Sequence, residues 1–129
     1  SMARGAAMAL SLRAGSPVQV EEVPSLADSL GGGIGLRNRW TFRLCRDLVD
    51  EVVLLDEADI YRGMRALFLD DRIVCEGACA VGVGALLAGK LRLDGPTAMI
   101  ISGRNVDMDQ FAKIVAGAPV PVGDRMVAA

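Results

Sequence analysis

Two short segments of this chain carry side chains that could do chemistry. In Ser102-Gly103-Arg104-Asn105, which follows an apolar run, Ser102 could present its hydroxyl to a ligand beyond the carboxyl end of a strand. The alternative is an ordinary turn in which Ser102 only caps the next helix. Glu76 is a carboxylate in an apolar setting, where it must be ion-paired, hydrogen-bonded or protonated. The alternative for Glu76 is a helix-terminal acid that the helix dipole favours.

A third segment, Gly31-Gly32-Gly33-Ile34-Gly35, could expose backbone N–H groups to an anion such as a phosphate. It lacks the lysine and the Ser/Thr of a phosphate-binding loop, and no strong strand precedes it. Glycine is commonly only a breaker of secondary structure. We therefore interpret this cluster as a flexible connector between helices.

Composition excludes several catalytic classes. The chain has no histidine, so it cannot build a Ser-His-Asp or Cys-His hydrolase, or most catalytic zinc sites. Only Lys90 and Lys113 could act as amine nucleophiles. The cysteines Cys45, Cys75 and Cys79 lack the spacing of metal ligands and are expected to be buried, reduced thiols. With no secretory signal visible, they predict a cytoplasmic protein.

Charge and hydropathy exclude two kinds of partner. The 14 basic residues are outnumbered by 16 acidic ones, whereas a protein that follows the phosphates of nucleic acid usually carries a basic surplus. The longest apolar run, residues 77–89, is too short to span a membrane. We therefore expect neither nucleic acid nor a membrane as a partner.

Alternating helices and strands must position these residues. Residues 51–55 and 97–101 are compact apolar runs that suit buried strands. Asp56 is expected to cap a helix, with Asp59 completing a weak capping box. Further helices are expected over residues 6–12, 36–49, 77–88 and 107–116. This order predicts an α/β fold with a parallel sheet and right-handed crossovers.

Two of the predicted helices have distinctive compositions. Leu36, Trp40, Leu44 and Leu48 recur every four residues, which predicts an apolar stripe that faces the core, with arginines on the solvated face. The helix over 77–88 consists almost wholly of small residues, and each interior glycine costs about 1 kcal/mol relative to alanine. We expect the close approach of a sheet or a ligand to offset that cost.

Four segments, taken in order, resemble the C-terminal third of the threonine/serine dehydratases and serine racemases, which are pyridoxal-phosphate enzymes of fold type II. They are Ser25-Leu-Ala-Asp-Ser29, Leu48-Val-Asp-Glu-Val-Val53, Arg72-Ile-Val-Cys-Glu-Gly-Ala78 and Ile101-Ser-Gly-Arg-Asn-Val-Asp107. The resemblance implies that residues 1–116 are the C-terminal segment of the large domain, followed by a loop-like tail over 117–129. Residues 25–36 are most similar to the dehydratases encoded with hydroxyectoine catabolism.

The resemblance implies roles for five residues. Ser102 matches the serine whose hydroxyl hydrogen-bonds the pyridine nitrogen of the cofactor. Gly103 and Asn105 match the turn that carries this serine. Glu76 matches a glutamate near the cofactor ring, and Ser29 stands where many relatives have a glycine that lines the ring pocket. A neutral hydroxyl does not keep the ring nitrogen protonated as a carboxylate would, which suits direct elimination of a β-hydroxyl.

The sequence also departs from the family pattern. Ser1 and Ala7 stand where relatives supply a glutamate and an aspartate to a divalent metal, so no metal site is expected. Arg104 replaces a small residue of the turn, and Gly77 replaces a common proline. The glycine cluster does not match the family's phosphate-binding loop, which lies earlier in the parent chain, and this agrees with its interpretation as a connector.

The lysine that forms the Schiff base with the cofactor is missing, because neither Lys90 nor Lys113 matches it. The segment is therefore expected to hold no catalytic residue and to be inactive alone. The resemblance implies the C-terminal portion of a dehydratase that acts on a small hydroxy-amino acid, with the full-length parent forming a homo-oligomer, a dimer. The alternatives are a non-catalytic α/β regulatory or assembly module, and a racemase or hydroxyectoine-related lyase as the parent.

Overall fold

The longest helix, α3 (Glu57–Asp71), begins where the sequence predicts. The computed structural model describes all residues from 1 to 129. Asp56 Oδ1 accepts a hydrogen bond from the Asp59 N–H at 2.9 Å, and Asp59 Oδ2 accepts one from the Asp56 N–H at 3.2 Å. This reciprocal pair is the capping box that the spacing of the two aspartates indicates.

The other helices confirm most of the predicted positions. They are α1 (Ala7–Ala14), α2 (Trp40–Leu48), α4 (Gly77–Leu87) and α5 (Met108–Val115), with a 3-10 turn η1 (Asp28–Leu30). Asp107 caps α5 by accepting from the Gln110 N–H at 2.8 Å, and Gly15 ends α1 in the left-handed conformation. No helix combines the length and the apolar character that crossing a bilayer requires.

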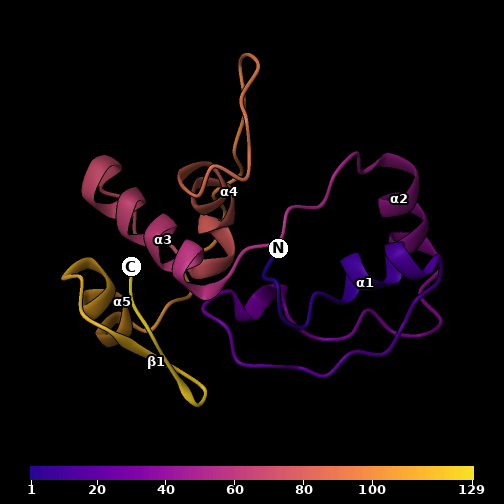
Figure 1. Cartoon of the computed structure of the whole chain (residues 1–129), viewed down its shortest axis with the longest axis horizontal. Helices are drawn as coiled ribbons and strands as arrows, with labels where there is room; N and C mark the ends of the chain where they lie inside the picture. The colour runs from indigo at the N-terminus through magenta and orange to yellow at the C-terminus, as the bar shows by residue number, and fades with distance from the viewer.

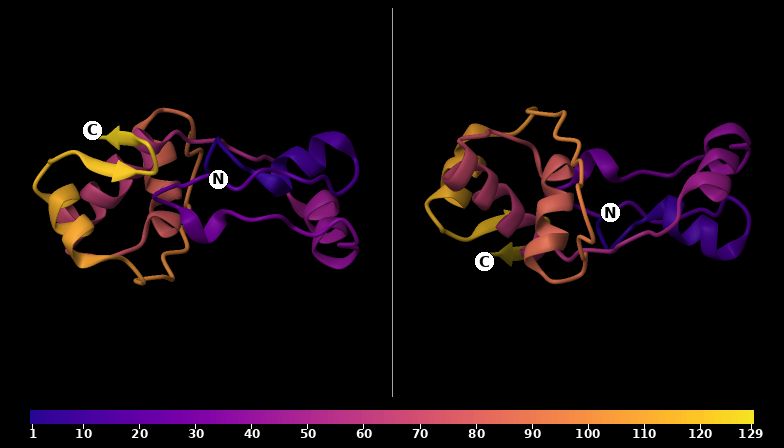
Figure 2. Two further views of the ribbon diagram at one scale, coloured as in Figure 1. Left: turned by 90° about the horizontal axis from the view of Figure 1, so that it is seen from below. Right: turned by 90° about the horizontal axis from the view of Figure 1, so that it is seen from above.

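The helices form two groups at opposite ends of an elongated molecule (Figures 1 and 2). One group contains α3, α4, α5 and a C-terminal hairpin, and the other contains α1 and α2. Extended segments connect the groups, and the amino terminus lies between them (Figure 2). The main apolar core of 17 buried residues lies mostly in the first group, where it includes Tyr61, Met64 and Ile114, and it also takes in Met2, Leu26, Ala27 and Leu55 from outside these elements. The candidate site residues lie on this core side of the molecule or on the segments that lead to it.

Glycines let α3 and α4 pack at close range. A Cβ on Gly63 would lie 2.5 Å from the Ala80 carbonyl oxygen, and a Cβ on Gly84 would lie 2.5 Å from the Asp59 carbonyl oxygen. The sequence predicts that a sheet or a ligand offsets the glycine content of α4. Here the neighbour at Gly63 and Gly84 is another helix, so backbone contact between two helices explains these glycines.

The predicted parallel strands are extended segments with little pairing. Within residues 51–55, Leu55 forms a single parallel bridge with Met2, through Leu55 N–H to Ser1 O at 2.8 Å and Ala3 N–H to Leu55 O at 2.6 Å. Residues 97–101 have no paired strand, and Ile100 is 82% exposed. A strand needs a hydrogen-bonded neighbour, and this chain offers one only to the first segment.

The apolar stripe of the helix predicted over 36–49 does not face the core. Trp40 and Leu48 are 74% and 72% exposed, and Leu36 and Leu44 are also exposed. Phe42, on another side of α2, is the one residue of that helix that is buried. The prediction that this stripe packs inward is wrong for this chain, because α2 packs against α1 at the far end from the main core.

The tail over residues 117–129 differs from the predicted loop. β1 (Val120–Val122) pairs antiparallel with β2 (Arg125–Val127), and the valines at 120, 122 and 127 are buried. The Tyr61 hydroxyl donates a hydrogen bond to the Ala118 carbonyl at 2.9 Å. Two prolines argue against a strand, but Pro121 lies in a two-stranded hairpin where its missing N–H breaks no ladder to a further strand.

Candidate functional site

Glu76 joins two segments that are distant in sequence. It immediately precedes α4, but its side chain does not cap that helix. Instead, Glu76 Oε1 accepts a hydrogen bond from the Ser29 hydroxyl at 3.0 Å, and Oε2 accepts one from the Asn105 N–H at 3.1 Å. The sequence leaves open whether Glu76 is hydrogen-bonded or is only a helix-terminal acid, and in the structure its carboxylate is hydrogen-bonded.

Gly103 lies directly against Glu76. A Cβ at residue 103 would be 2.5 Å from both Cδ and Oε1 of Glu76, so no larger residue fits without movement. The Glu76 N–H donates a hydrogen bond to the Gly103 carbonyl at 3.2 Å. Four of the five predicted site residues, Ser29, Glu76, Gly103 and Asn105, thus form one contact group, which we call the Glu76 cluster.

The fifth predicted residue, Ser102, borders this cluster. It precedes Gly103, is exposed, and makes no hydrogen bond within the chain. Ser102 is not a helix cap, since Asp107 performs that capping role for α5. Arg104, which departs from the family pattern, is also exposed.

Cys79 is a part of this site that the sequence did not predict. Its Sγ accepts a hydrogen bond from the Gly103 N–H at 2.8 Å and donates one to the Gly103 carbonyl at 3.4 Å. Cys79 follows Glu76 by three residues, a spacing that puts two side chains on one face of a helix. This spacing does not indicate a contact with residue 103, and from the sequence Cys79 is expected only to be a buried, reduced thiol.

The two lysines lie elsewhere. Lys90 Nζ is 2.5 Å from Asp59 Oδ2, and Arg62 also pairs with the Asp59 carboxylate. Burial raises the pKa of Asp59, but hydrogen bonds from Lys90, the Asp56 backbone and Arg62 outweigh it and hold the pKa below its ordinary value. Lys113 is exposed on α5. Lys90 therefore neutralises a buried carboxylate, and neither lysine enters the Glu76 cluster.

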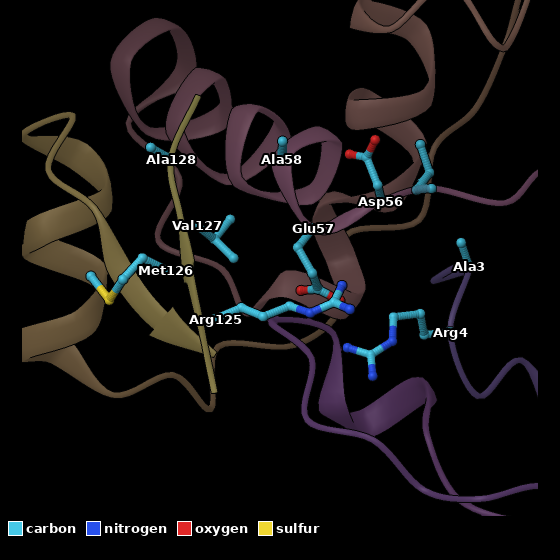
Figure 3. A pocket seen from close by; sticks show the side chains of 10 residues that line it. Ala3, Arg4, Asp56, Glu57, Ala58, Arg125, Met126, Val127 and Ala128 are labelled. Carbon is cyan, nitrogen blue, oxygen red and sulfur yellow. The ribbon is translucent and has the colours of Figure 1, made fainter. Parts of the chain in front are cut away.

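A separate cavity of about 300 Å³ opens between β2 and the start of α3 (Figure 3). Arg4, Glu57 and Arg125 are the charged residues, besides Asp56, that line it (Figure 3). Glu57 Oε2 accepts a hydrogen bond from the Leu26 N–H at 2.7 Å and so attaches the segment before η1 to α3. None of the residues of the Glu76 cluster lines this cavity.

No group of three side chains with metal-ligating atoms gathers in the chain. The resemblance matches Ser1 and Ala7 to acidic metal ligands, and neither residue has surroundings of that kind. The Ser1 amine donates a hydrogen bond to the Val53 carbonyl at 2.7 Å, and Ala7 is buried in α1. The glycine cluster over residues 31–35 lies in a connecting segment between η1 and α2.

Comparisons with known proteins give one consistent family. Residues 1–103 match the model of the pyridoxal-phosphate dependent enzymes. A protein of Sinorhizobium fredii that is provisionally named a threonine dehydratase is 50% identical over 118 residues, which are 91% of this chain and 36% of that protein. An L-threonine ammonia-lyase of Geobacter sulfurreducens is 38% identical over 88% of this chain and 28% of its own length. The chain thus spans about a third of the relatives that it matches.

The comparison with solved structures agrees. The crystal structure of a threonine deaminase from T.th. superimposes with a TM-score of 0.71 at 29% sequence identity, covering 82% of this chain and 38% of that one. This similarity confirms the predicted α/β fold class and the resemblance to the threonine dehydratases. The matched chain is more than twice as long, so most of its residues have no counterpart here.

Proposed function

Because this chain belongs to the family of pyridoxal-phosphate dependent enzymes, we propose that it is the C-terminal portion of a hydroxy-amino-acid dehydratase of the threonine/serine ammonia-lyase type. The complete enzyme eliminates the β-hydroxyl of its substrate and then releases ammonia to give a 2-oxo acid. Relatives named threonine dehydratase and L-threonine ammonia-lyase support this reaction class. Within this proposal, residues 1–116 form the C-terminal segment of the large domain.

The observation that carries the proposal is the double hydrogen bond of Glu76. Its carboxylate holds the Ser29 hydroxyl with one oxygen and the Asn105 N–H with the other. Residues separated by 47 and 29 positions from Glu76 are thereby held on one side of α4. The resemblance to the dehydratases implies a cofactor site at these residues, and an unrelated set has no reason to converge on one carboxylate.

The residues present fit the ring end of pyridoxal phosphate. Ser102 has a free hydroxyl at the border of the Glu76 cluster, and Gly103 has no side chain to obstruct it. When bound, the cofactor supplies an electron-accepting ring. We assign to Ser102 a hydrogen bond to the ring nitrogen, and to Ser29 and Glu76 the lining of the same side. A neutral hydroxyl orients the ring without fixing a proton on its nitrogen.

The remaining parts of the active site belong to other residues of the complete enzyme. Lys90 is committed to Asp59, so the amine that binds the cofactor is proposed to come from outside this chain. The phosphate-binding loop and the surface that recognises the substrate carboxylate are likewise proposed to come from outside this chain. The substrate class is a small hydroxy-amino acid, and the complete enzyme is proposed to be a cytoplasmic homodimer that is allied to the hydroxyectoine-associated dehydratases.

The test uses the chain joined to the missing amino-terminal portion of its parent enzyme. We expect the complete enzyme to form 2-oxo acids from L-threonine or L-serine in the presence of pyridoxal phosphate. Ser102→Ala should weaken cofactor binding, shift the cofactor absorbance and lower turnover. Ser16→Ala is the matched control, because Ser16 is an exposed serine without a hydrogen bond.

Two outcomes would contradict separate parts of the proposal. If Ser102→Ala leaves both absorbance and turnover unchanged, the assignment of the ring-nitrogen hydrogen bond is wrong. If the joined enzyme binds the cofactor but forms no 2-oxo acid from any hydroxy-amino acid, the dehydratase assignment is wrong. Racemisation of serine without release of ammonia would identify a racemase instead.

A further inference from the structure

We propose that Cys79 is a positioning residue for the turn over residues 102–105, and that its thiol fixes the Gly103 peptide and thereby the direction of the Ser102 hydroxyl. The geometric part of this inference stands on the hydrogen bonds of Cys79 alone. The consequence for the cofactor rests on the function proposed for Ser102 above.

The thiol contacts both backbone polar groups of Gly103. The Gly103 N–H donates to Sγ at 2.8 Å, and Sγ donates to the Gly103 carbonyl at 3.4 Å. The same carbonyl also accepts from the Glu76 N–H at 3.2 Å. Two groups at the start of α4 therefore hold one peptide carbonyl, and only Cys79 holds the N–H.

No other side chain in the first turn of α4 can replace this thiol. The residues around Cys79 in the first turn of α4 are Gly77, Ala78 and Ala80, which carry no polar side-chain atom. Cys79 is only 8% exposed, so water has little access to its position. If the thiol is removed, the partly buried Gly103 N–H loses its acceptor, and a backbone donor without a partner favours a different arrangement of the turn.

The turn is held at alternate residues. Cys79 and the Glu76 backbone hold Gly103, while the Glu76 carboxylate holds the Asn105 N–H. Ser102, which precedes Gly103, and Arg104, which lies between Gly103 and Asn105, are exposed. This arrangement holds the backbone of the turn against α4 and leaves Ser102 exposed. Loss of the Gly103 anchor frees the residue that carries the proposed ring contact.

Cys75 provides a matched control from the same region. It is also a buried cysteine, with no exposed surface, but it makes no hydrogen bond to the turn. Burial raises the pKa of its thiol to about 11, so it stays a protonated thiol at neutral pH. Removing the sulfur of Cys75 therefore perturbs the core near the site without removing an anchor of Gly103.

The experiment measures amide hydrogen exchange of the whole 129-residue chain by NMR. In the unaltered chain, the Gly103 amide should exchange more slowly than those of Ser102 and Arg104, which have no acceptor. Cys79→Ala should accelerate the exchange of Gly103 about tenfold, as expected when one hydrogen bond is lost. Cys79→Ser should restore most of the protection, because a hydroxyl also donates and accepts, and Cys75→Ala should leave Gly103 protected.

Equal exchange of Gly103 in Cys79→Ala and Cys75→Ala would overturn the positioning role, as would failure of Cys79→Ser to restore protection. If Cys79→Ala does not fold, the unaltered chain decides, because a Gly103 amide that exchanges as fast as Ser102 is incompatible with the proposal. In the joined enzyme, Cys79→Ala should weaken pyridoxal phosphate binding severalfold more than Cys79→Ser. Faster Gly103 exchange with unchanged cofactor binding would contradict the role of Ser102 and leave the positioning by Cys79 intact.

Discussion

The Glu76 carboxylate fills the space that a side chain on residue 103 would need, since a Cβ at Gly103 would lie 2.5 Å from Glu76 Cδ and Oε1. Gly103 does not have a positive φ, so its requirement for glycine is steric and not conformational. The carboxylate cannot retreat freely because Ser29 and Asn105 hold its two oxygens. Glu76 can therefore occupy its position only because residue 103 is a glycine, and a larger residue at 103 would fit only if Glu76 moved.

Gly103→Ala should destabilise the chain by about 1–3 kcal/mol, the usual range for overpacking, because either Glu76 or the turn must move. Chemical denaturation followed by circular dichroism measures the free energy of unfolding. Gly33→Ala is the control, since a Cβ at Gly33 meets no atom within 4 Å and its φ is not positive. The destabilisation should be largely absent when Glu76→Ala is introduced first, because the clash then has no partner. Simple additivity of the two substitutions would contradict this relationship.

Two glycines on facing helices should respond to alanine with opposite signs. Gly63→Ala should destabilise the chain by roughly 1–3 kcal/mol, because its Cβ would lie 2.5 Å from the Ala80 carbonyl oxygen. Gly82→Ala should stabilise it by up to about 1 kcal/mol, because its Cβ would meet only the flexible Met99 side chain at 3.4 Å and alanine favours the helix. Thermal unfolding of both variants tests the pair, and a stabilising Gly63→Ala would contradict the close packing of α3 on α4.

Because of Asp59, the free energy of unfolding of the chain should decrease at acidic pH. Its pKa in the folded chain is held below the ordinary value of 3.8, so its ionised form stabilises the fold above that pH. This contribution falls as the pH drops through the lowered pKa. Asp59→Asn should lose it at neutral pH and show a flatter decline of unfolding free energy below about pH 4. Asp94→Asn, which removes an exposed carboxylate, should keep the wild-type pH profile.

The hydrogen bond from the Tyr61 hydroxyl to the Ala118 carbonyl should hold the C-terminal hairpin against α3. Tyr61→Phe removes it and leaves the carbonyl without this donor, which should destabilise the chain by about 1 kcal/mol. Limited proteolysis should then cleave within residues 118–129 faster than in the unaltered chain. Unchanged cleavage of the hairpin would show that the buried valines alone hold it.

The sequence predicted the local features well because short-range rules determine them. The capping box of Asp56 and Asp59 follows from side chains within three residues of the helix start. The predicted site residues Ser29, Glu76, Gly103 and Asn105 also lie together, but their selection came from a family resemblance. The periodicity of apolar residues does not predict that Ser29 contacts Glu76.

Features that depend on distant neighbours were not predictable. Apolar spacing identifies the stripe of α2 but not what covers it, and in this chain Trp40 and Leu48 remain exposed. A strand-like composition over residues 97–101 does not supply a strand to pair with. The role of Cys79 depends on a turn 24 residues away, and nothing in its own surroundings in the sequence indicates that contact.

The exposed stripe of α2 includes the only tryptophan of the protein. Trp40 therefore acts as an intrinsic fluorophore at a single known position. In the 129-residue chain its emission should lie at the long wavelength of a solvated indole and be quenched readily by iodide. When the chain is joined to the rest of its enzyme, any surface that covers the stripe will shift this emission to shorter wavelength, so assembly can be followed without an added label.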